Sequence, residues 1–469
     1  MSEELTWLSA GELRALIGRG DVSSVEVVDH FLNRIEKLNP QLRAFAHLDP
    51  DTVRRQAEVA DAARQRGEAL GPLHGVPVSV KENLAVAGLP YSFPRKGESG
   101  ISQYDAIAVE RLRAAGAIVV GTNTMQGTGG AATAQTNPEA ALMSSYNWDR
   151  EARNPWDTGR VPGWSSSGGA AAVAAGLLPV AIGSDGGGST RLPAAYSGIF
   201  GVHPTRGLIP HVNYARPSLR FSATNGPLTR SARDAALVTQ VLAGPDGRDY
   251  ICITDEPGDY LAALTDGIAG MRLAWTDDFG YASREASAES ARVIELVRQS
   301  AFRLRDLGAT VASTDQTWEP ANRGGGPAPG EPEVYSIDVG SGKAPAIPVD
   351  PAEYKHAAEW RARNLDGFRT LFREYDLLLS VTSQHIAPTV STWDENWTAR
   401  PAEYAVTYTS HTVLCNLLGL PAVSVPCGFI DDMPVGLQII GPPRAEAQIF
   451  RLASAFQQAF PRREHPPMS

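Results

Sequence analysis

Cysteines and long apolar runs are both scarce in this sequence, and each scarcity excludes a class of protein. Three cysteines occur among 469 residues and form no Cys-x-x-Cys pair, so we expect neither a disulfide framework nor a cysteine metal cage. No apolar stretch approaches the roughly 18 residues that a membrane span requires. The first residues lack the basic segment followed by an apolar one that marks a secretory signal. We therefore expect a cytoplasmic protein that makes no membrane contact.

An excess of basic charge is also missing. Asp and Glu together number 52 and Lys and Arg 42, which gives a formal net charge of -10. Because nucleic acids are bound largely through basic side chains that neutralise phosphates, we expect no nucleic-acid partner. Hydrophobic residues make up 43% of the chain, enough to form a packed core. The length fits two or three domains, or one unusually large α/β domain.

The best-known catalytic and nucleotide-binding motifs are absent as well. The sequence contains no Gly-x-x-x-x-Gly-Lys-[Ser/Thr] loop, no Gly-x-Ser-x-Gly elbow and no Ser-x-x-Lys pair. Its nine histidines are scattered, and none has the His-Glu-x-x-His spacing of a zinc site. No metal site is therefore expected.

Helical and apolar segments alternate along the chain. Residues 23–26 have capping-box spacing, and apolar residues then recur with a helical period until Asn39-Pro40, where the helix should end. Further helices are expected at 50–67, 105–115, 169–176, 232–243, 284–307, 403–419 and after 444, and strands at 76–83, 117–121, 178–182, 271–275, 309–311, 377–379, 422–426 and 435–440. Because the strands are apolar without in–out alternation, we expect a mixed or parallel sheet covered on both faces.

Two loops rich in glycine and serine stand out, at 162–169 and 183–191. The predicted helix and strand between them have similar lengths, roughly 13 Å and 16 Å, so both loops should lie at one edge of the sheet. Consecutive glycine N–H groups could cradle a phosphate, or form an oxyanion hole in which Gly186, Gly187 and Gly188 surround a carbonyl attacked by Ser189. A third interpretation is structural, with the glycines permitting tight turns.

Lysine is scarce, and one lysine has an unusual place. Of five lysines, only Lys81 ends an apolar strand, where it is expected to be buried. Burial lowers the pKa of a lysine and makes it available as a general base near neutral pH. An ion pair with Glu82 or another carboxylate is the alternative interpretation.

These segments resemble the amidase signature family. Its pattern contains a Gly-Gly-Ser-Ser-Gly-Gly-Ser loop, an Asp-x-Gly-Gly-Ser-x-Arg loop 24 residues later, and a Pro-Ala-Ala-x-x-Gly run before Gly-x-x-Pro-Thr. The counterparts here are 163–169, 185–191, 193–198 and 201–205. The segments 70–77, 226–231, 416–422 and 434–438 also fit, so the similarity covers nearly the whole chain.

The resemblance implies one large α/β domain over 1–469, with a central mixed, mostly parallel twisted sheet covered by helices on both faces. Within it we expect an N-terminal helical segment at about 1–68, a catalytic core at about 69–245, a variable excursion at about 315–400 and core elements at about 401–469. The Gly- and Pro-rich stretch 317–350 is expected to be an ordered surface loop or, alternatively, a mobile lid.

The resemblance also implies a Ser–cis-Ser–Lys triad that needs no metal or organic cofactor. Ser189 would be the nucleophile, Ser165 the bridging serine and Lys81 the base, and the Trp164–Ser165 peptide bond would be cis. Backbone N–H groups of Gly186, Gly187 and Gly188 would line the oxyanion hole. Substrate-pocket candidates are Met125, Gln126, Trp164 and Arg191. Two aromatic groups could also line a pocket: Tyr146, Trp148, Trp156 and Trp164, and Trp393, Trp397, Tyr404 and Tyr408.

Three functions fit these features. The first is a hydrolase of small or medium, apolar or aryl amides, with esters and carbamates as further substrates. The second is the glutaminase subunit of a tRNA-dependent amidotransferase, which would require partner subunits. The third is a non-catalytic binding protein on the same fold. A small-molecule amide or related acyl substrate is the expected partner, and a homodimer is compatible with the sequence.

Overall fold

The structure of the chain is a computed structural model that describes residues 2–90, 101–125, 151–211, 223–282, 287–320, 351–399 and 407–468. Gln126, Tyr146, Trp148, Tyr404 and almost all of the 317–350 stretch lie outside these residues, as does the side chain of Trp397.

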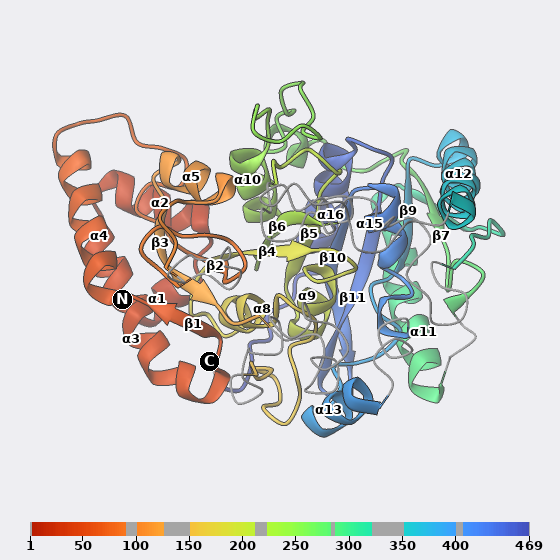
Figure 1. Cartoon of the computed structure of the whole chain (residues 1–469), viewed down its shortest axis with the longest axis horizontal. Coiled ribbons are helices and arrows are strands. Elements are labelled where there is room, and N and C mark those ends of the chain that lie inside the picture. The colour runs from red at the N-terminus through yellow and green to blue at the C-terminus, as the bar shows by residue number, and fades with distance from the viewer. Residues whose placement is uncertain are drawn as a thin grey trace.

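One sheet of eleven strands runs through the described part of the chain (Figure 1). Its order is β1-β3-β2-β4-β6-β5-β10-β11-β9-β7-β8. The strands are β1 (Phe45–Leu48), β2 (Pro77–Lys81), β3 (Ile118–Asn123), β4 (Val180–Asp185), β5 (Phe200–His203), β6 (Thr224–Thr229), β7 (Arg272–Trp275), β8 (Thr310–Ser313), β9 (Leu377–Val381), β10 (Ala422–Ile430) and β11 (Met433–Ile440).

The sheet is mixed, as predicted, but it is not mostly parallel. Parallel pairing joins β2 to β3 and β4, and β7 to β8 and β9. The other six pairings are antiparallel. The physical reason lies in the middle of the sheet, where β10 and β11 form a hairpin and β6 returns antiparallel to β4. Strands from distant parts of the chain thus build one continuous sheet.

Both faces of the sheet are covered, and the alternation of side chains along single strands shows it. In β4, Val180 and Ile182 pack into one apolar cluster with the N-terminal helices, whereas Ala181 points into another beside α8. Likewise Leu377 and Leu379 of β9 face one cluster and Leu378 the opposite one. Because neighbouring residues of a strand point to opposite faces, each of these strands is buried between two helical layers.

The N-terminal segment forms α1 (Ser2–Trp7), α2 (Ala10–Arg19), α3 (Ser24–Leu42) and α4 (Pro50–Gln65). The predicted capping box is present, with Ser23 and Glu26 bonded to each other's backbone N–H groups. The helix does not stop at Pro40 but continues to Leu42. A proline in the last turn removes one hydrogen bond without ending the helix at once.

The remaining helices are α5 (Ile107–Ala114), α8 (Ser167–Ala174), α9 (Arg191–Ser197), α10 (Ala232–Leu242), α11 (Ala288–Phe302), α12 (Pro351–Glu374), α13 (Val390–Ala399), α15 (Val413–Leu418) and α16 (Glu446–Ala459). In Figure 1 the N-terminal helices lie at one end of the sheet and α12 at the other. The helices α9, α12 and α13 and the strands β1, β5 and β6 were not predicted. No described helix is long and apolar enough to cross a membrane.

The two serine loops meet at the carboxyl ends of β2 and β4. These strands are parallel neighbours, with Val80 opposite Ile182. The chain leaves the first loop through α8 and returns through β4 to the second loop, as the lengths of these elements predicted. Catalytic groups in α/β proteins commonly gather where parallel strands end in this way.

Candidate active site

Lys81 is the last residue of β2 and is buried at the centre of the candidate site. The strand lies between β3 and β4, and all five of its residues are buried. Only 2% of Lys81 is exposed. Its side chain therefore cannot reach water freely and depends on neighbouring polar groups.

The Lys81 Nζ atom contacts both serine loops. It lies 2.6 Å from Ser165 Oγ, 3.1 Å from Ser166 Oγ and 3.0 Å from Ser184 Oγ. A fourth contact of 3.3 Å joins it to the Ser184 carbonyl oxygen. Ser166 Oγ in turn donates to that carbonyl at 3.2 Å and accepts from the Ser184 N–H at 3.3 Å. The lysine thus links residues that are more than eighty positions away in the sequence.

Burial gives Lys81 the protonation behaviour of a base. Removal from water lowers the pKa of Lys81 from 10.5 to about 7, although the charges of Asp185 and Glu82 raise it in part. The alternative of an ion pair with Glu82 is not found, because among the described residues no carboxylate oxygen lies within ion-pair distance of Lys81 Nζ. The Glu82 carboxylate instead accepts the Met125 N–H at 2.6 Å. A substantial fraction of Lys81 is therefore neutral near pH 7.

The number of contacts around Lys81 Nζ indicates how the neutral amine would bond. A neutral amine has two N–H donors and one lone pair, whereas an ammonium has three donors and no acceptor. Ser166 and Ser184 offer acceptors for the two donors. The lone pair is then available to the Ser165 hydroxyl, which makes the shortest contact. Loss of a proton from Lys81 would therefore turn Ser165 from an acceptor into a donor.

The peptide bond before Ser165 differs from the expectation. The described residues contain no cis peptide bond, so the predicted cis link between Trp164 and Ser165 is wrong for this structure. A trans bond is the lower-energy form for a residue other than proline. Gly163, with φ of 97°, supplies the turn that precedes it. Ser165 reaches Lys81 with the trans arrangement.

The predicted nucleophile, Ser189, lies in the loop between β4 and α9, five residues after Ser184, and is partly exposed. Among the described residues, no hydrogen bond joins its hydroxyl to that of Ser165. The structure therefore brings together Lys81 and Ser165 and places Ser189 on the adjoining loop; among the described residues, no hydrogen bond joins the Ser189 side chain to either of them.

A buried ion pair fixes the loop that carries Ser189. Arg191 Nε and Nη2 lie 3.0 Å and 3.1 Å from the two carboxylate oxygens of Asp185, and neither side chain is exposed. Asp185 also accepts the Thr190 hydroxyl at 2.8 Å. Burial alone would raise the pKa of Asp185, but the Arg191 charge, the neighbouring His203 and the hydrogen bonds from Arg191 and Asn416 together hold that pKa well below its usual range.

Arg191 is not a pocket residue, which corrects the prediction. Besides Asp185, its guanidinium donates to Gln438 Oε1 at 2.8 Å and to Asn416 Oδ1 at 2.6 Å. All of these partners are buried. The planar guanidinium group, with several N–H donors in fixed directions, suits such a multiple contact. Arg191 therefore links the loop that carries Ser189 to β11 and α15 through hydrogen bonds.

One of the three predicted oxyanion donors already donates a hydrogen bond within its own loop. The Gly188 N–H donates to Asp185 Oδ1 at 2.6 Å, so it is directed into its own loop, and its assignment to the oxyanion hole is corrected. The N–H groups of Gly186 and Gly187 donate to no described residue. These two remain candidate donors for an oxyanion.

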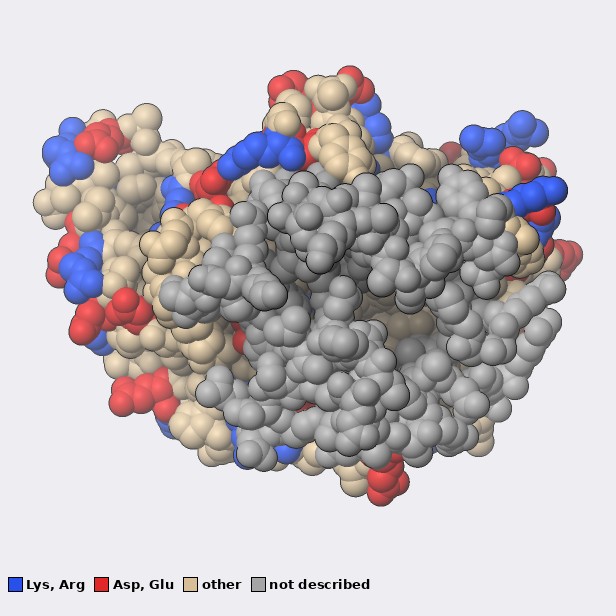
Figure 2. Space-filling view, in the orientation of Figure 1, with Lys and Arg blue, Asp and Glu red and all other residues tan. Residues whose placement is uncertain are grey.

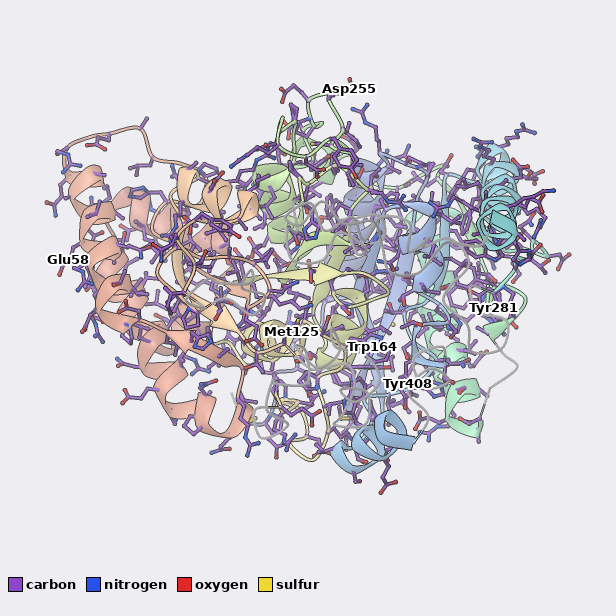
Figure 3. All side chains as sticks on the ribbon, in the orientation of Figure 1. Glu58, Met125, Trp164, Asp255, Tyr281 and Tyr408 are labelled. Carbon is purple, nitrogen blue, oxygen red and sulfur yellow. The ribbon has the colours of Figure 1, made fainter. Side chains whose placement is uncertain are left out.

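The other predicted pocket residues are largely packed. Trp164 is 5% exposed and Met125 4% exposed. Trp164 makes edge contacts with Trp393 and Tyr408, at ring-centre distances of 5.0 Å and 6.3 Å. Trp164 and Tyr408 lie near each other in Figure 3, with Met125 further toward the N-terminal helices. Trp156 instead packs against Phe429. Trp164 of the first predicted aromatic group thus packs against Trp393 and Tyr408 of the second, as part of an apolar cluster.

The sequence-based prediction missed the residues that surround the predicted triad. These are Ser166 and Ser184 around the lysine, and Thr412, Asn416 and Gln438 around the nucleophile loop. Ser166 directly follows Ser165, and Ser184 lies in the same glycine-rich loop as Ser189, so both could have been found from their place in these loops. The other three lie more than 200 residues away, and nothing in their local sequence signals the contact.

Charge on the described part of the face shown in Figure 2 is mixed. In Figure 2 the basic and acidic side chains on the described part of this face are interspersed around its edge. In the part of the chain that the structure describes, no group of three or more His, Cys, Asp or Glu side chains is placed to hold a metal ion.

Known proteins match this chain over nearly its full length. A family model described as Amidase matches residues 26–318 and 335–450. A relative from Symbiobacterium thermophilum, named as a subunit of glutamyl-tRNA(Gln) amidotransferase, is 34% identical, over 96% of this chain and 96% of the relative. A relative named acylamidase from Rhodococcus erythropolis is 31% identical, over 98% and 97%.

The fold also matches a solved structure. Native peptide amidase from Stenotrophomonas maltophilia superposes with a TM-score of 0.76 at 26% identity, covering 99% of both chains. The family match, the relatives and the shared fold agree with one another. The chain therefore belongs to the amidase signature family and is an amidohydrolase.

Proposed function

We propose that the protein hydrolyses the C–N bond of small or medium, apolar or aryl amides through an acyl-enzyme on Ser189. The observation that carries the proposal is the contact of 2.6 Å between Ser165 Oγ and a buried lysine whose pKa is about 7. This pair supplies a base at neutral pH next to a hydroxyl that can relay a proton.

The reaction would proceed in two stages. Neutral Lys81 accepts the Ser165 proton while Ser165 accepts the proton of Ser189, and the Ser189 oxygen bonds to the amide carbonyl carbon. The N–H groups of Gly186 and Gly187 would stabilise the resulting oxyanion. The C–N bond then breaks as the relayed proton passes to the leaving nitrogen. Water next attacks the ester carbonyl, which releases the acid and returns the proton to Ser189.

Binding of substrate would have to complete the relay between the two serines. Ser165 and Ser189 are both partly exposed, and rotation about a single side-chain bond moves each hydroxyl. Catalytic hydrogen bonds often tighten only in the substrate complex. The lack of a hydrogen bond between the two hydroxyls is therefore compatible with the proposed relay.

Purified protein can be tested against a panel of anilides, primary amides, aryl esters and carbamates. Hydrolysis of apolar anilides or amides, together with release of the amine before the acid, supports the proposal. Turnover of none of these compounds by folded protein contradicts it. Ester and carbamate hydrolysis would follow from the same acyl-enzyme chemistry.

A glutaminase subunit of an amidotransferase is the second candidate, because the relative from Symbiobacterium thermophilum is named as an amidotransferase component at 34% identity. Glutamine hydrolysis that appears only after addition of partner subunits would favour this candidate. A non-catalytic binding protein finds no support among these relatives, which are named as enzymes. A homodimer, a cytoplasmic location and the four-part division of the chain stay predictions.

A further inference from the structure

A threonine outside both serine loops contacts the peptide next to the nucleophile. Thr412 Oγ1 donates a hydrogen bond of 2.7 Å to the carbonyl oxygen of Gly187. Thr412 directly precedes α15 and is fully buried. Gly187 lies two residues before Ser189, so this bond reaches the loop on which the proposed chemistry depends.

The peptide unit between Gly187 and Gly188 is held from both ends. Its carbonyl accepts the Thr412 hydroxyl at 2.7 Å, and its N–H donates to Asp185 Oδ1 at 2.6 Å. The carbonyl and N–H of a trans peptide point in opposite directions in one plane. Two bonds at opposite ends therefore fix the orientation of that plane.

Gly188 allows Thr412 to approach this closely. A Cβ atom at Gly188 would lie 2.4 Å from Thr412 Oγ1, and the residue has φ of 130°, which side chains other than glycine rarely adopt. The side chains of Thr412 and Leu192 thus occupy the space that a Cβ atom at position 188 would need.

Thr412 itself has little freedom. Its N–H donates to the Thr409 carbonyl at 2.9 Å, and its own carbonyl accepts Arg191 Nη1 at 3.0 Å. The hydroxyl also lies 3.2 Å from the Thr409 carbonyl. Because a hydroxyl has one proton, the shorter contact to Gly187 is the favoured bond.

We propose that Thr412 is a positioning residue for catalysis, which orients the Gly187–Gly188 peptide and thereby the neighbouring N–H of Gly187 and the hydroxyl of Ser189. The inference rests on the proposed function, because it assigns Thr412 a role in amide hydrolysis. Thr412 itself touches no reacting atom. It acts through the peptide plane, whose rotation would misdirect the oxyanion donor and the nucleophile together.

The test compares Thr412→Val, which keeps the shape and removes the hydroxyl, with Thr412→Ser, which keeps the hydroxyl. Thr412→Val should lower kcat about 10- to 100-fold and change KM by less than about threefold, because the loss falls on the transition state. Thr412→Ser should retain kcat within about threefold. The pH at which activity is half-maximal should be unchanged in both variants, since neither alters Lys81.

Thr229→Val is a matched control. Thr229 is also fully buried and donates its hydroxyl to a backbone carbonyl, that of Ser231, at 2.8 Å. It sits opposite Val180, at the end of β4 away from Asp185, about 17 Å along the strand. The control should lose stability like Thr412→Val and keep wild-type kcat.

Several outcomes would overturn the inference. These are wild-type kcat in Thr412→Val, equal losses of kcat in the serine and valine variants, or an equal loss in Thr229→Val. If Thr412→Val does not fold, Thr412→Ala replaces it with the same criteria. Failure of the wild-type protein to hydrolyse any amide would contradict the proposed function instead, so the two failures are distinguishable.

Discussion

Lys81 Nζ lies 2.6 Å from Ser165 Oγ at the buried carboxyl end of β2. A lysine in such a place would ordinarily need a carboxylate partner, because an unpaired buried charge is costly. Here Lys81 Nζ contacts three hydroxyls and one carbonyl oxygen. Burial instead lowers the pKa of Lys81, so that much of the amine is uncharged near pH 7. The same burial that disfavours the charged amine thus creates a base.

Activity should depend on pH through Lys81. Because its pKa is about 7 and the neutral amine is the base, kcat/KM should fall about tenfold per pH unit below pH 7 and level off above it. A pH–rate profile for an anilide between pH 5 and 9 measures this. A flat profile over that range would contradict the assigned base.

Replacement of Lys81 by methionine should lower kcat/KM by about 10² to 10⁴-fold, the usual contribution of a general base. Lys355→Met is the control, since the Lys355 side chain is 76% exposed and pairs only loosely with Glu359 at 3.8 Å. Kinetics on the same amide measure both effects. Comparable losses in the two variants would show that the effect is not specific to the buried amine.

Lys81 should also make stability depend on pH. Its folded-state pKa of about 7 lies below the ordinary value of 10.5, so between these values the unfolded chain binds one more proton. The free energy of unfolding should therefore rise with pH, by about 1.4 kcal/mol per unit at most. Urea unfolding at pH 7.5 and 9.5 should show this rise in the wild type and not in Lys81→Met. Identical pH dependence in both proteins would argue against the lowered pKa.

The ion pair between Arg191 and Asp185 should support the fold rather than bind substrate. Arg191→Met leaves a buried carboxylate unpaired, and we expect it to cost about 3–5 kcal/mol of unfolding free energy. Arg292→Met is the surface control, because Arg292 and Asp431 are both about half exposed (54%), and little change is expected there. Denaturant unfolding compares them. Wild-type stability in Arg191→Met, with only KM raised, would restore the pocket assignment.

The sequence was sufficient for the elements whose signal is local. The capping box at Ser23 and Glu26, the apolar run that ends in Lys81, and the similar lengths of α8 and β4 all predicted what the structure shows. The strand β6 was missed because its sequence, Thr-Asn-Gly-Pro-Leu-Thr, has no apolar pattern and contains Gly226 and Pro227. Such residues usually mark turns, and only pairing with β4 and β5 makes this segment a strand.

The sequence points to the residues that we propose to react, but not to the residues that surround them. Lys81, Ser165 and Ser189 stand in recognisable motifs, whereas Asn416 and Gln438 reach Arg191 only because β11 and α15 fold over the loop. Arg191 itself was misassigned, since a charged residue beside a nucleophile is normally expected at a surface. Asp185 is a local partner, but its other partners, Thr412, Asn416 and Gln438, come from the C-terminal part of the chain.

The most direct test is the labelling of the protein by a serine-directed fluorophosphonate, with the modified residue located by mass spectrometry. Labelling should occur at Ser189, accelerate as pH rises through about 7, and be lost in Ser189→Ala. Ser165→Ala and Lys81→Met should retain Ser189 but label it far more slowly. Modification of another serine, or a rate at Ser189 that is unchanged in Lys81→Met, would contradict the account.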